Sequence, residues 1–201
     1  MVRALRLNTI LLLLGTFIMS ETLKYWYNEP PFWQETEDKI IVQTGAKTDF
    51  WRITHYGFIE DNGHFYYQEI SGDFEMEVKI TGQYQTLYDQ GGLMVRESET
   101  VWLKCGIEFV EEVQNISAVI TRDYSDWSVI PLSSPPASLW LKLKRQAESV
   151  EIKYSFNGQD YQLLRLGYLT PNTTVQAGLM CASPQGEGFL TTFEEFKIQI
   201  S

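Results

Sequence analysis

The stretch WLKCGIEF, residues 102–109, decides the fold class. Apolar residues occupy every odd position from Leu103 to Phe109, and a different set of residues, including Lys104 and Glu108, occupies the even positions. Because successive side chains of a β-strand point to opposite faces, this period of two predicts a strand with one face in a hydrophobic core.

The same alternation recurs before and after this stretch. FEMEVKI at 74–80 and LWLKLK at 139–144 alternate in the same way, and turn sequences such as Asn157-Gly158 separate the apolar runs and predict hairpins. No window beyond the N-terminal leader has a helical period, and the chain has no tandem repeat. Many short strands at close spacing predict an all-β protein in which two antiparallel sheets pack face to face as a β-sandwich.

The composition fits one globular domain and excludes some classes of partner. The chain has 201 residues, of which 44% are hydrophobic, so a single core can stabilise it without disulfides or metals. Its 16 Lys and Arg residues against 26 Asp and Glu give a net charge of −10. Because this charge repels polyanions and no basic run is present, we expect neither nucleic acid nor a membrane as a partner. Cys105 and Cys181 allow either a disulfide or two buried thiols.

We expect residues 1–20 to lie outside the folded domain, which is predicted to span 21–201. A basic start precedes an apolar run at 10–14 that is too short to cross a bilayer but long enough for the core of a signal peptide. The alternative is that translation starts at Met19. The first interpretation predicts a secreted protein and the second, which we favour, a cytoplasmic one.

Several blocks of the sequence carry a resemblance to a known family. They are WYNEPP (26–31), TDFWR (48–52), YGF (56–58), DNGHF (61–65), DQGGLMVR (89–96), WLKCGIEF (102–109), TRDYSDWS (121–128) and GLMCASP (178–184). In order and length these blocks resemble a bacterial and fungal family of domains of unknown function, also called the regulation-of-enolase type. This family is similar in fold to the concanavalin A-like lectins and glucanases.

The resemblance runs from about Tyr25 to the C-terminus and implies a concanavalin A-like jelly-roll sandwich with a concave sheet. It also implies a relevance to carbohydrate. It supplies no reaction, since no catalytic residues are established for the family. Members typically begin close to the WYNEPP block, which is why we favour Met19 as the start.

The even positions of the deciding stretch are the first candidates for a binding site. Trp102, Lys104 and Glu108 alternate with the core residues, so they point away from the core. An aromatic plane beside charged groups suits a sugar ring and its hydroxyls, which predicts a concave ligand-binding groove. The alternative is a salt-bridged surface in which a loop covers the tryptophan.

Further candidates lie on predicted loops and strand ends near the same face. Arg122, Asp126 and Trp127 either contact ligand hydroxyls or close a turn. A larger group completes the predicted ligand-binding set: Trp51, His55, His64, Gln90 and Arg96. The two histidines are the only ones in the chain, and a metal site needs three or more ligands at suitable spacing. We therefore expect no metal and no cofactor.

One acidic pattern suggests catalysis. Asp73, Glu75 and Glu77 lie two residues apart and therefore on one face of a strand, as do the catalytic carboxylates of retaining glucanases. The order of the acids differs from that of those enzymes, and alternating acids also occur on exposed strands as solubilising surface. We therefore prefer the surface interpretation and assign no catalytic residue.

Three functions remain open from the sequence. We favour a non-catalytic module that binds a carbohydrate in the groove. The second is a protein-interaction regulator that presents the same aromatic patch to another protein. The third is a glycoside hydrolase, which predicts that two carboxylates, for example Glu108 with Asp126 or Glu75, face each other in the groove at a catalytic separation.

Overall fold

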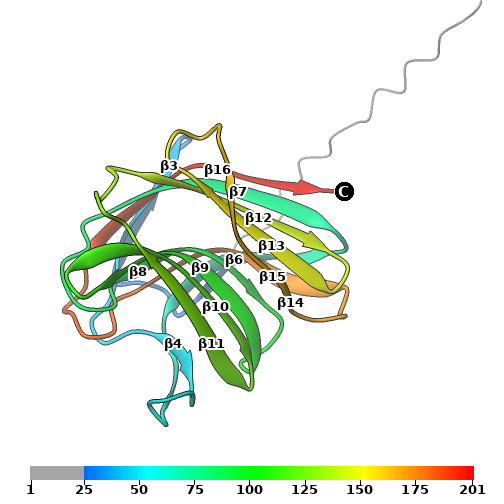
Figure 1. Ribbon diagram of the computed structural model, residues 1–201, viewed down its shortest axis with the longest axis horizontal. Coiled ribbons are helices and arrows are strands. Elements are labelled where there is room, and N and C mark those ends of the chain that lie inside the picture. Colours follow the sequence, from blue (N-terminus) through cyan, green and yellow to red (C-terminus); the bar gives the residue numbers. More distant parts are fainter. Residues whose placement is uncertain (1–24) are drawn as a thin grey trace, which may run out of the picture.

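The computed structural model describes residues 25–201, and both interpretations of residues 1–20 concern a segment outside this range. In residues 25–201 all the regular structure is β-strand, so this part of the chain has no helix that could span a membrane. The strands form two seven-stranded antiparallel sheets and one small two-stranded sheet. Figure 1 shows the two large sheets stacked face to face, which confirms the predicted sandwich.

The first sheet contains, from edge to edge, β1 (Tyr25–Tyr27), β6 (His64–Ser71), β15 (Thr174–Ala182), β8 (Gln90–Arg96), β9 (Val101–Val110), β10 (Val113–Arg122) and β11 (Tyr124–Pro131). The second contains β14 (Gln162–Tyr168), β13 (Ser149–Ser155), β12 (Leu139–Gln146), β7 (Phe74–Gly82), β16 (Leu190–Ile200), β3 (Lys39–Gln43) and β2 (Phe32–Glu35). The small sheet is the hairpin of β4 (Phe50–Arg52) and β5 (Ile59–Asp61).

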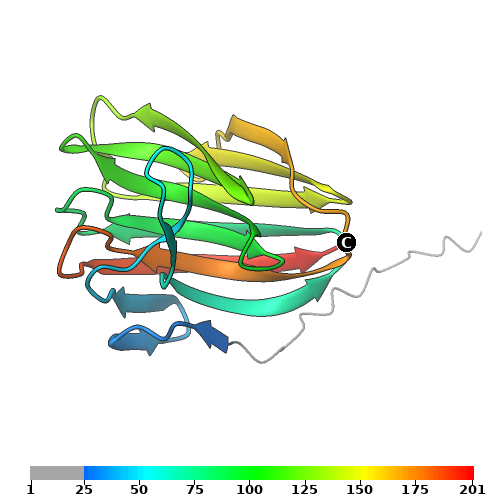
Figure 2. The same ribbon diagram turned by 90° about the horizontal axis from the view of Figure 1, so that it is seen from below.

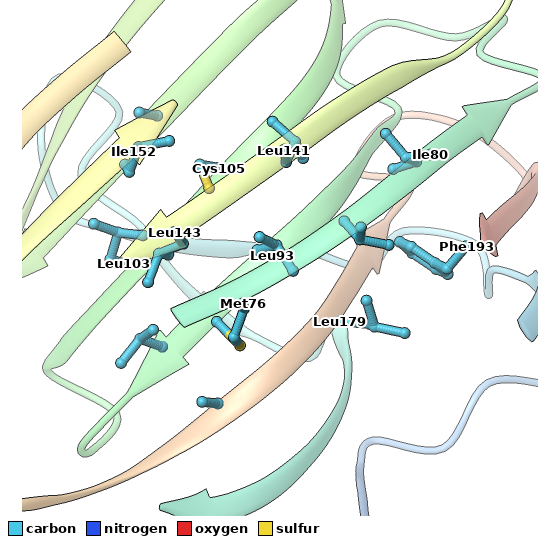
Figure 3. Packing of buried hydrophobic residues seen from close by; sticks show 14 of the residues in the cluster. Met76, Ile80, Leu93, Leu103, Cys105, Leu141, Leu143, Ile152, Leu179 and Phe193 are labelled. Carbon is cyan, nitrogen blue, oxygen red and sulfur yellow. The ribbon is translucent and has the colours of Figure 1, made fainter. Parts of the chain in front are cut away.

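The main core lies between the two large sheets and is built by the alternation seen in the sequence. On β7 the residues Met76 and Ile80 are buried, while Glu75 and Glu77 lie on the outer face. From β9, Leu103 and Cys105 enter the same core (Figure 3). A period of two in the sequence thus places one side of each strand against the opposite sheet.

The predicted Asn157-Gly158 hairpin is confirmed, with a longer connection than a two-residue turn. Strands β13 and β14 pair antiparallel, and residues 156–161 connect them. Gly158 has a φ of +72°, a backbone conformation that favours glycine. The Asn157 side-chain oxygen accepts hydrogen bonds from the backbone N–H groups of Gln159 and Asp160, both 2.9 Å, which stabilises the turn.

The two cysteines lie on different strands of the first sheet and do not meet. Cys105 on β9 is opposite Leu93 of β8, and Cys181 on β15 is opposite Gly91 of β8. Because β8 lies between them, their Cα atoms are about two strand spacings apart, roughly 9.5 Å. A disulfide requires less than about 7 Å. Both residues are therefore buried free thiols of the core.

The outer face of the first sheet carries a second, smaller hydrophobic cluster. The β4–β5 hairpin folds across this face, so Phe50 and Trp51 pack on Trp102 and Met94. Figures 1 and 2 show the hairpin segment lying outside the first sheet, on the side away from the second sheet. Strand β9 is therefore buried on both faces, and Trp102 has an exposed fraction of 0%.

Candidate functional site

A hollow of about 260 Å³ lies on this outer face, beside the hairpin. Side chains from the hairpin, from β9 and β11, and from three loops surround it. They are Lys47, Asp49, Trp51, Tyr56, Phe58, Glu60, Tyr88, Lys104, Glu108, Trp127, Pro184 and Gln185. The volume is slightly below the roughly 300–1,000 Å³ of drug-sized sites, so the hollow suits a small molecule or the end of a longer one.

Aromatic rings at steep angles to one another form its walls. Trp127 stands at 88° to Trp51 with 6.4 Å between ring centroids, and at 76° to Tyr88 with 6.3 Å. Tyr56 meets Trp51 at 66° and stacks on Phe58. The hydroxyls of Tyr56 and Tyr88 lie 3.1 Å apart and connect the hairpin to the loop before β8. Rings from three separate segments thus present faces and edges to the same hollow.

Two glycines allow the backbone beneath the hollow to pack closely. Gly92 of β8 lies directly opposite Gly106 of β9. A Cβ atom at Gly92 would lie 1.9 Å from the carbonyl oxygen of Cys105, and one at Gly106 would lie 2.0 Å from that of Gly91. No side chain fits at either position. In the even-position set of β9, Gly106 therefore leaves a gap in the row of side chains between Lys104 and Glu108.

Glu108 is a buried carboxylate with one oxygen in use. Its Oε2 accepts hydrogen bonds from the Ser117 hydroxyl at 2.6 Å and from the Trp127 indole N–H at 2.9 Å. The residue is only 6% exposed. Burial raises the pKa of the Glu108 carboxyl, while the nearby Lys104 ammonium and these hydrogen bonds act in the opposite direction. Within residues 25–201, Glu108 has no ion-pair partner, although it lines the hollow.

Lys104 fastens the hairpin to the sheet. Its Nζ donates to the carbonyl oxygen of Phe50 at 2.6 Å and contacts Asp49 Oδ1 at 3.2 Å. Asp49 Oδ1 also accepts the Phe50 backbone N–H at 2.7 Å and the Gln90 amide at 3.3 Å. Lys104 itself is 4% exposed. This buried network positions the start of β4, and with it Trp51, over the outer face of the sheet.

Of the eleven residues predicted as ligand-binding, the structure brings four together around the hollow. These are Trp51, Lys104, Glu108 and Trp127. The prediction that Trp102 faces the groove is wrong. The hairpin covers its ring completely, and its indole N–H donates to the carbonyl oxygen of Glu99. The covered-tryptophan alternative describes this residue correctly.

Three more predicted residues are buried and lie outside the lining of the hollow. Gln90 donates to Asp49 and to the carbonyl oxygen of Tyr88. Arg96 forms an ion pair with Asp61 at 2.9 Å. These contacts give Gln90 and Arg96 structural roles, so the geometry does not support direct contact of either side chain with a ligand in the groove.

His64 is the third buried residue, and it holds the β3–β4 connection in place. Its Nδ1 lies 2.6 Å from the carbonyl oxygen of Asn28, and its Nε2 accepts the Gly45 backbone N–H at 2.8 Å. The ring is therefore neutral with the proton on Nδ1. Burial lowers the pKa of His64, which agrees with this state.

The last three predicted residues are exposed and lie outside the lining. His55 sits in the β4–β5 turn, with its ring 4.8 Å from that of Tyr56. Arg122 packs its guanidinium 4.5 Å above the ring of Tyr168 on the second sheet. Asp126 pairs with Arg165 at 2.8 Å. Because Asp126 and Trp127 are neighbours on strand β11, their side chains point to opposite faces.

The two carboxylate pairs suggested for a glycosidase, Glu108 with Asp126 or with Glu75, do not form, although Asp49, Glu60 and Glu108 all line the hollow. Asp126 faces away from the hollow, as described above. Glu75 and Glu77 lie on the outer face of the second sheet, where Lys142 pairs with them at 3.7 and 3.2 Å. Asp73 accepts the Ala147 backbone N–H. These contacts fit the interpretation of Asp73, Glu75 and Glu77 as surface residues. Residues 25–201 contain no cluster of metal-ligating side chains.

Sequence reasoning missed most of the aromatic wall. Tyr56 and Phe58 belong to the quoted YGF block, and Tyr88 immediately precedes another block, yet none of them lies in an alternating strand. One available signal was Gly57 between two aromatic residues, which indicates a turn that exposes both rings. Glu60, Lys47, Pro184 and Gln185 gave no comparable signal.

The fold and the hollow define a concanavalin A-like β-sandwich with an aromatic pocket on one sheet. Residues 26–200 match the family model described as "Protein of unknown function (DUF1349)", and the chain belongs to this family. It is also 34% identical over 173 residues to "Regulation of enolase protein 1" of Saccharomyces cerevisiae, covering 86% of this chain and 87% of that protein.

Solved structures support the same assignment. A crystal structure of a functionally unknown protein from Saccharomyces cerevisiae superposes with a TM-score of 0.85 at 33% identity, covering 89% of this chain and 96% of that one. The carbohydrate binding module CBM66 from Bacillus subtilis gives a TM-score of 0.55 at 14% identity, covering 87% and 94%. At that identity the second likeness concerns the fold alone.

Proposed function

We propose that the protein is a non-catalytic binding module that holds a carbohydrate in the hollow. The observation that carries the proposal is the wall of mutually tilted rings around Trp127, beside buried polar groups. Flat aromatic faces pack on the C–H faces of sugar rings, and a few fixed polar groups orient the hydroxyls. Glu108 supplies such a group, since one of its oxygens is already held by Ser117 and Trp127.

Four residues around the hollow have strained backbone conformations, as do six other non-glycine residues among 25–201. Lys47, Ile53, His55 and Tyr88 have positive φ values between 56° and 70°, which L-residues rarely adopt. Such conformations cost of order 1–3 kcal/mol each and tend to gather at binding sites. Two of these residues line the hollow, and the other two lie in the turn between β4 and β5.

A second observation is that the fold resembles that of a solved carbohydrate binding module. The carbohydrate binding module CBM66 has the same sandwich and is similar in fold to this chain over nearly its whole length. This likeness raises the expectation of sugar binding without fixing the ligand.

The test is a glycan array followed by calorimetric titration of the sugars that bind. We expect Phe58→Ala to weaken binding about tenfold, because loss of a stacked aromatic face costs about 1–2 kcal/mol. Phe58 is 43% exposed, so its removal leaves the core intact. The matched control is Phe32→Ala on β2, the edge strand of the second sheet, where the side chain is 54% exposed and is not part of the lining. A folded protein that binds no sugar on the array refutes the proposal.

A protein-interaction regulator is the second candidate, and two observations favour it. One is the name of the relative from Saccharomyces cerevisiae, which refers to regulation of enolase. The other is the exposed apolar tip of the hairpin, formed by Tyr56, Phe58 and Ile59. The test adds the purified protein to an assay of purified enolase. An effect that Phe58→Ala abolishes and sugars do not alter favours regulation over carbohydrate binding.

A further inference from the structure

The lysines that line the hollow contact oxygen atoms of the protein, whereas the carboxylates that line it are only partly paired. Lys104 is neutralised by Asp49 at 3.2 Å and by the carbonyl oxygen of Phe50. At the rim, Lys47 donates to the carbonyl oxygen of Gln185 at 2.5 Å and lies 3.8 Å from Glu187. Both lysines of the lining therefore already contact oxygen atoms of the protein, and neither presents an unpaired positive charge to a ligand.

Two carboxylates of the lining lack such partners. In the part of the chain that the structure describes, neither Glu108 nor Glu60 forms an ion pair. Glu60 lies on β5 at the exposed rim. Glu108 is buried at the base of the site, and the nearby Lys104 ammonium is already paired with Asp49, so the cost of burying the Glu108 carboxylate is only partly compensated. A positive charge in the hollow would offset this cost.

The aromatic rings of the lining are also unoccupied by cations of the protein. Five cation–π contacts occur among residues 25–201, and they use the rings of Trp140, Tyr27, Trp102, Tyr168 and Tyr161. None of these rings lines the hollow. The rings of Trp51, Trp127 and Tyr88 stand at steep angles to one another, an arrangement that can enclose an ammonium group.

We propose that the ligand group that enters the hollow carries a positive charge and, resting on the carbohydrate function proposed above, that this group is the protonated amine of an amino sugar. The ammonium lies against the aromatic wall and within reach of Glu108 and Glu60. The sugar ring that bears it packs on the remaining aromatic faces. The net charge of −10 on the whole chain favours the approach of such a ligand.

The test compares tetrasaccharides that differ mainly in charge, titrated at a pH where the amine is protonated. They are the glucosamine tetramer, its fully N-acetylated form, the neutral glucose tetramer and the galacturonate tetramer. We expect the glucosamine tetramer to bind at least about tenfold more tightly than the neutral glucose tetramer, and the galacturonate tetramer to bind most weakly. The preference should shrink as salt is added, since charges at the rim are screened.

Variants identify the acids that are responsible. Glu108→Gln keeps the shape of the side chain and removes its charge, so it should weaken binding of the glucosamine tetramer more than binding of the neutral tetramer and remove most of the tenfold preference. Because Glu108 is buried, Glu60→Gln is measured as well, with an expected loss of about twofold to threefold in the same preference. The control is Glu75→Gln, the same change of charge on the outer face of the second sheet, which should leave the preference unaltered.

The outcomes separate the two proposals. Equal binding of the amine and neutral tetramers, or tighter binding of the galacturonate tetramer, overturns the inference of a cationic ligand and leaves carbohydrate binding in place. A preference that survives in both glutamine variants also overturns it. Failure of every tetramer to bind the folded protein refutes carbohydrate binding itself.

Discussion

Replacing Lys104 with methionine tests whether one buried ammonium fastens the hairpin that builds the hollow. The Lys104→Met change keeps the length of the side chain but removes the contacts of Nζ with Asp49 and with the carbonyl oxygen of Phe50. Removing one partner of a buried ion pair typically costs about 3–5 kcal/mol. Asp49 keeps its hydrogen bonds from the Phe50 N–H and from Gln90, so we expect the lower end, about 3 kcal/mol.

Urea denaturation followed by tryptophan fluorescence measures this loss. With an m-value of about 2–3 kcal/mol per molar urea, the midpoint should fall by about 1 M or more. The matched control is Lys142→Met on the second sheet, where the lysine pairs with Glu77 at 3.2 Å but is partly exposed. Exposed pairs contribute about 0–1 kcal/mol, so the control should shift the midpoint far less.

The double variant Lys104→Met, Asp49→Asn completes the argument. If the two side chains act as a pair, the double variant loses less stability than the sum of the single variants, by about 1–3 kcal/mol. An equal midpoint shift for Lys104→Met and Lys142→Met would refute the reasoning. So would additive single effects, because Lys104 would then not act through Asp49.

Three further outcomes are expected. Gly106→Ala should unfold the protein or cost several kcal/mol in thermal denaturation, because its Cβ would meet a backbone carbonyl at 2.0 Å, whereas Gly57→Ala, in open space at φ +76°, should cost about 1 kcal/mol. Burial lowers the pKa of His64 in the fold, so the unfolded chain binds a proton first as the pH falls below about 6.5, and the free energy of unfolding decreases. This decrease between pH 7 and 5 should be smaller in His64→Gln than in the unmodified protein. Equal decreases in the two proteins would contradict this role of His64. Under oxidising conditions Cys105 and Cys181 should not form an intramolecular disulfide. Both should react with thiol reagents only after unfolding, since both are buried and burial raises the pKa of Cys105 to about 12. A mass two hydrogens lower in the folded protein would contradict the structure.

The strand pattern could be predicted because alternation is a local property. Residues 102–109 and 74–80 show it in the sequence, and both form strands whose apolar faces meet in one core. Alternation identifies the two faces of a strand but does not tell whether the second face is open. Trp102 was therefore expected in a groove, although the distant β4–β5 hairpin covers it.

The same limit applies to the site residues: positions set by a strand face could be predicted, and positions set by tertiary contacts could not. Lys104 and Glu108 could be predicted because they share a strand face, and their neighbours on the adjacent strands follow from pairing. Asp126 could have been excluded by the same rule, once residues 124–131 are taken as a strand with Trp127 on the opposite face. Tyr56 and Tyr88 could not be placed, since their positions depend on tertiary contacts between two loops.

The hairpin of β4 and β5 is a small sheet of its own, and its ladder of hydrogen bonds joins neither large sheet. It nevertheless supplies Trp51, Tyr56, Phe58 and Glu60 to the hollow. Its sequence can therefore vary between Ile53 and Glu60 while the sandwich beneath keeps its pairing. A library randomised in this turn, with Lys104 and Asp49 retained as the anchor, offers a direct way to re-engineer which molecule the domain selects.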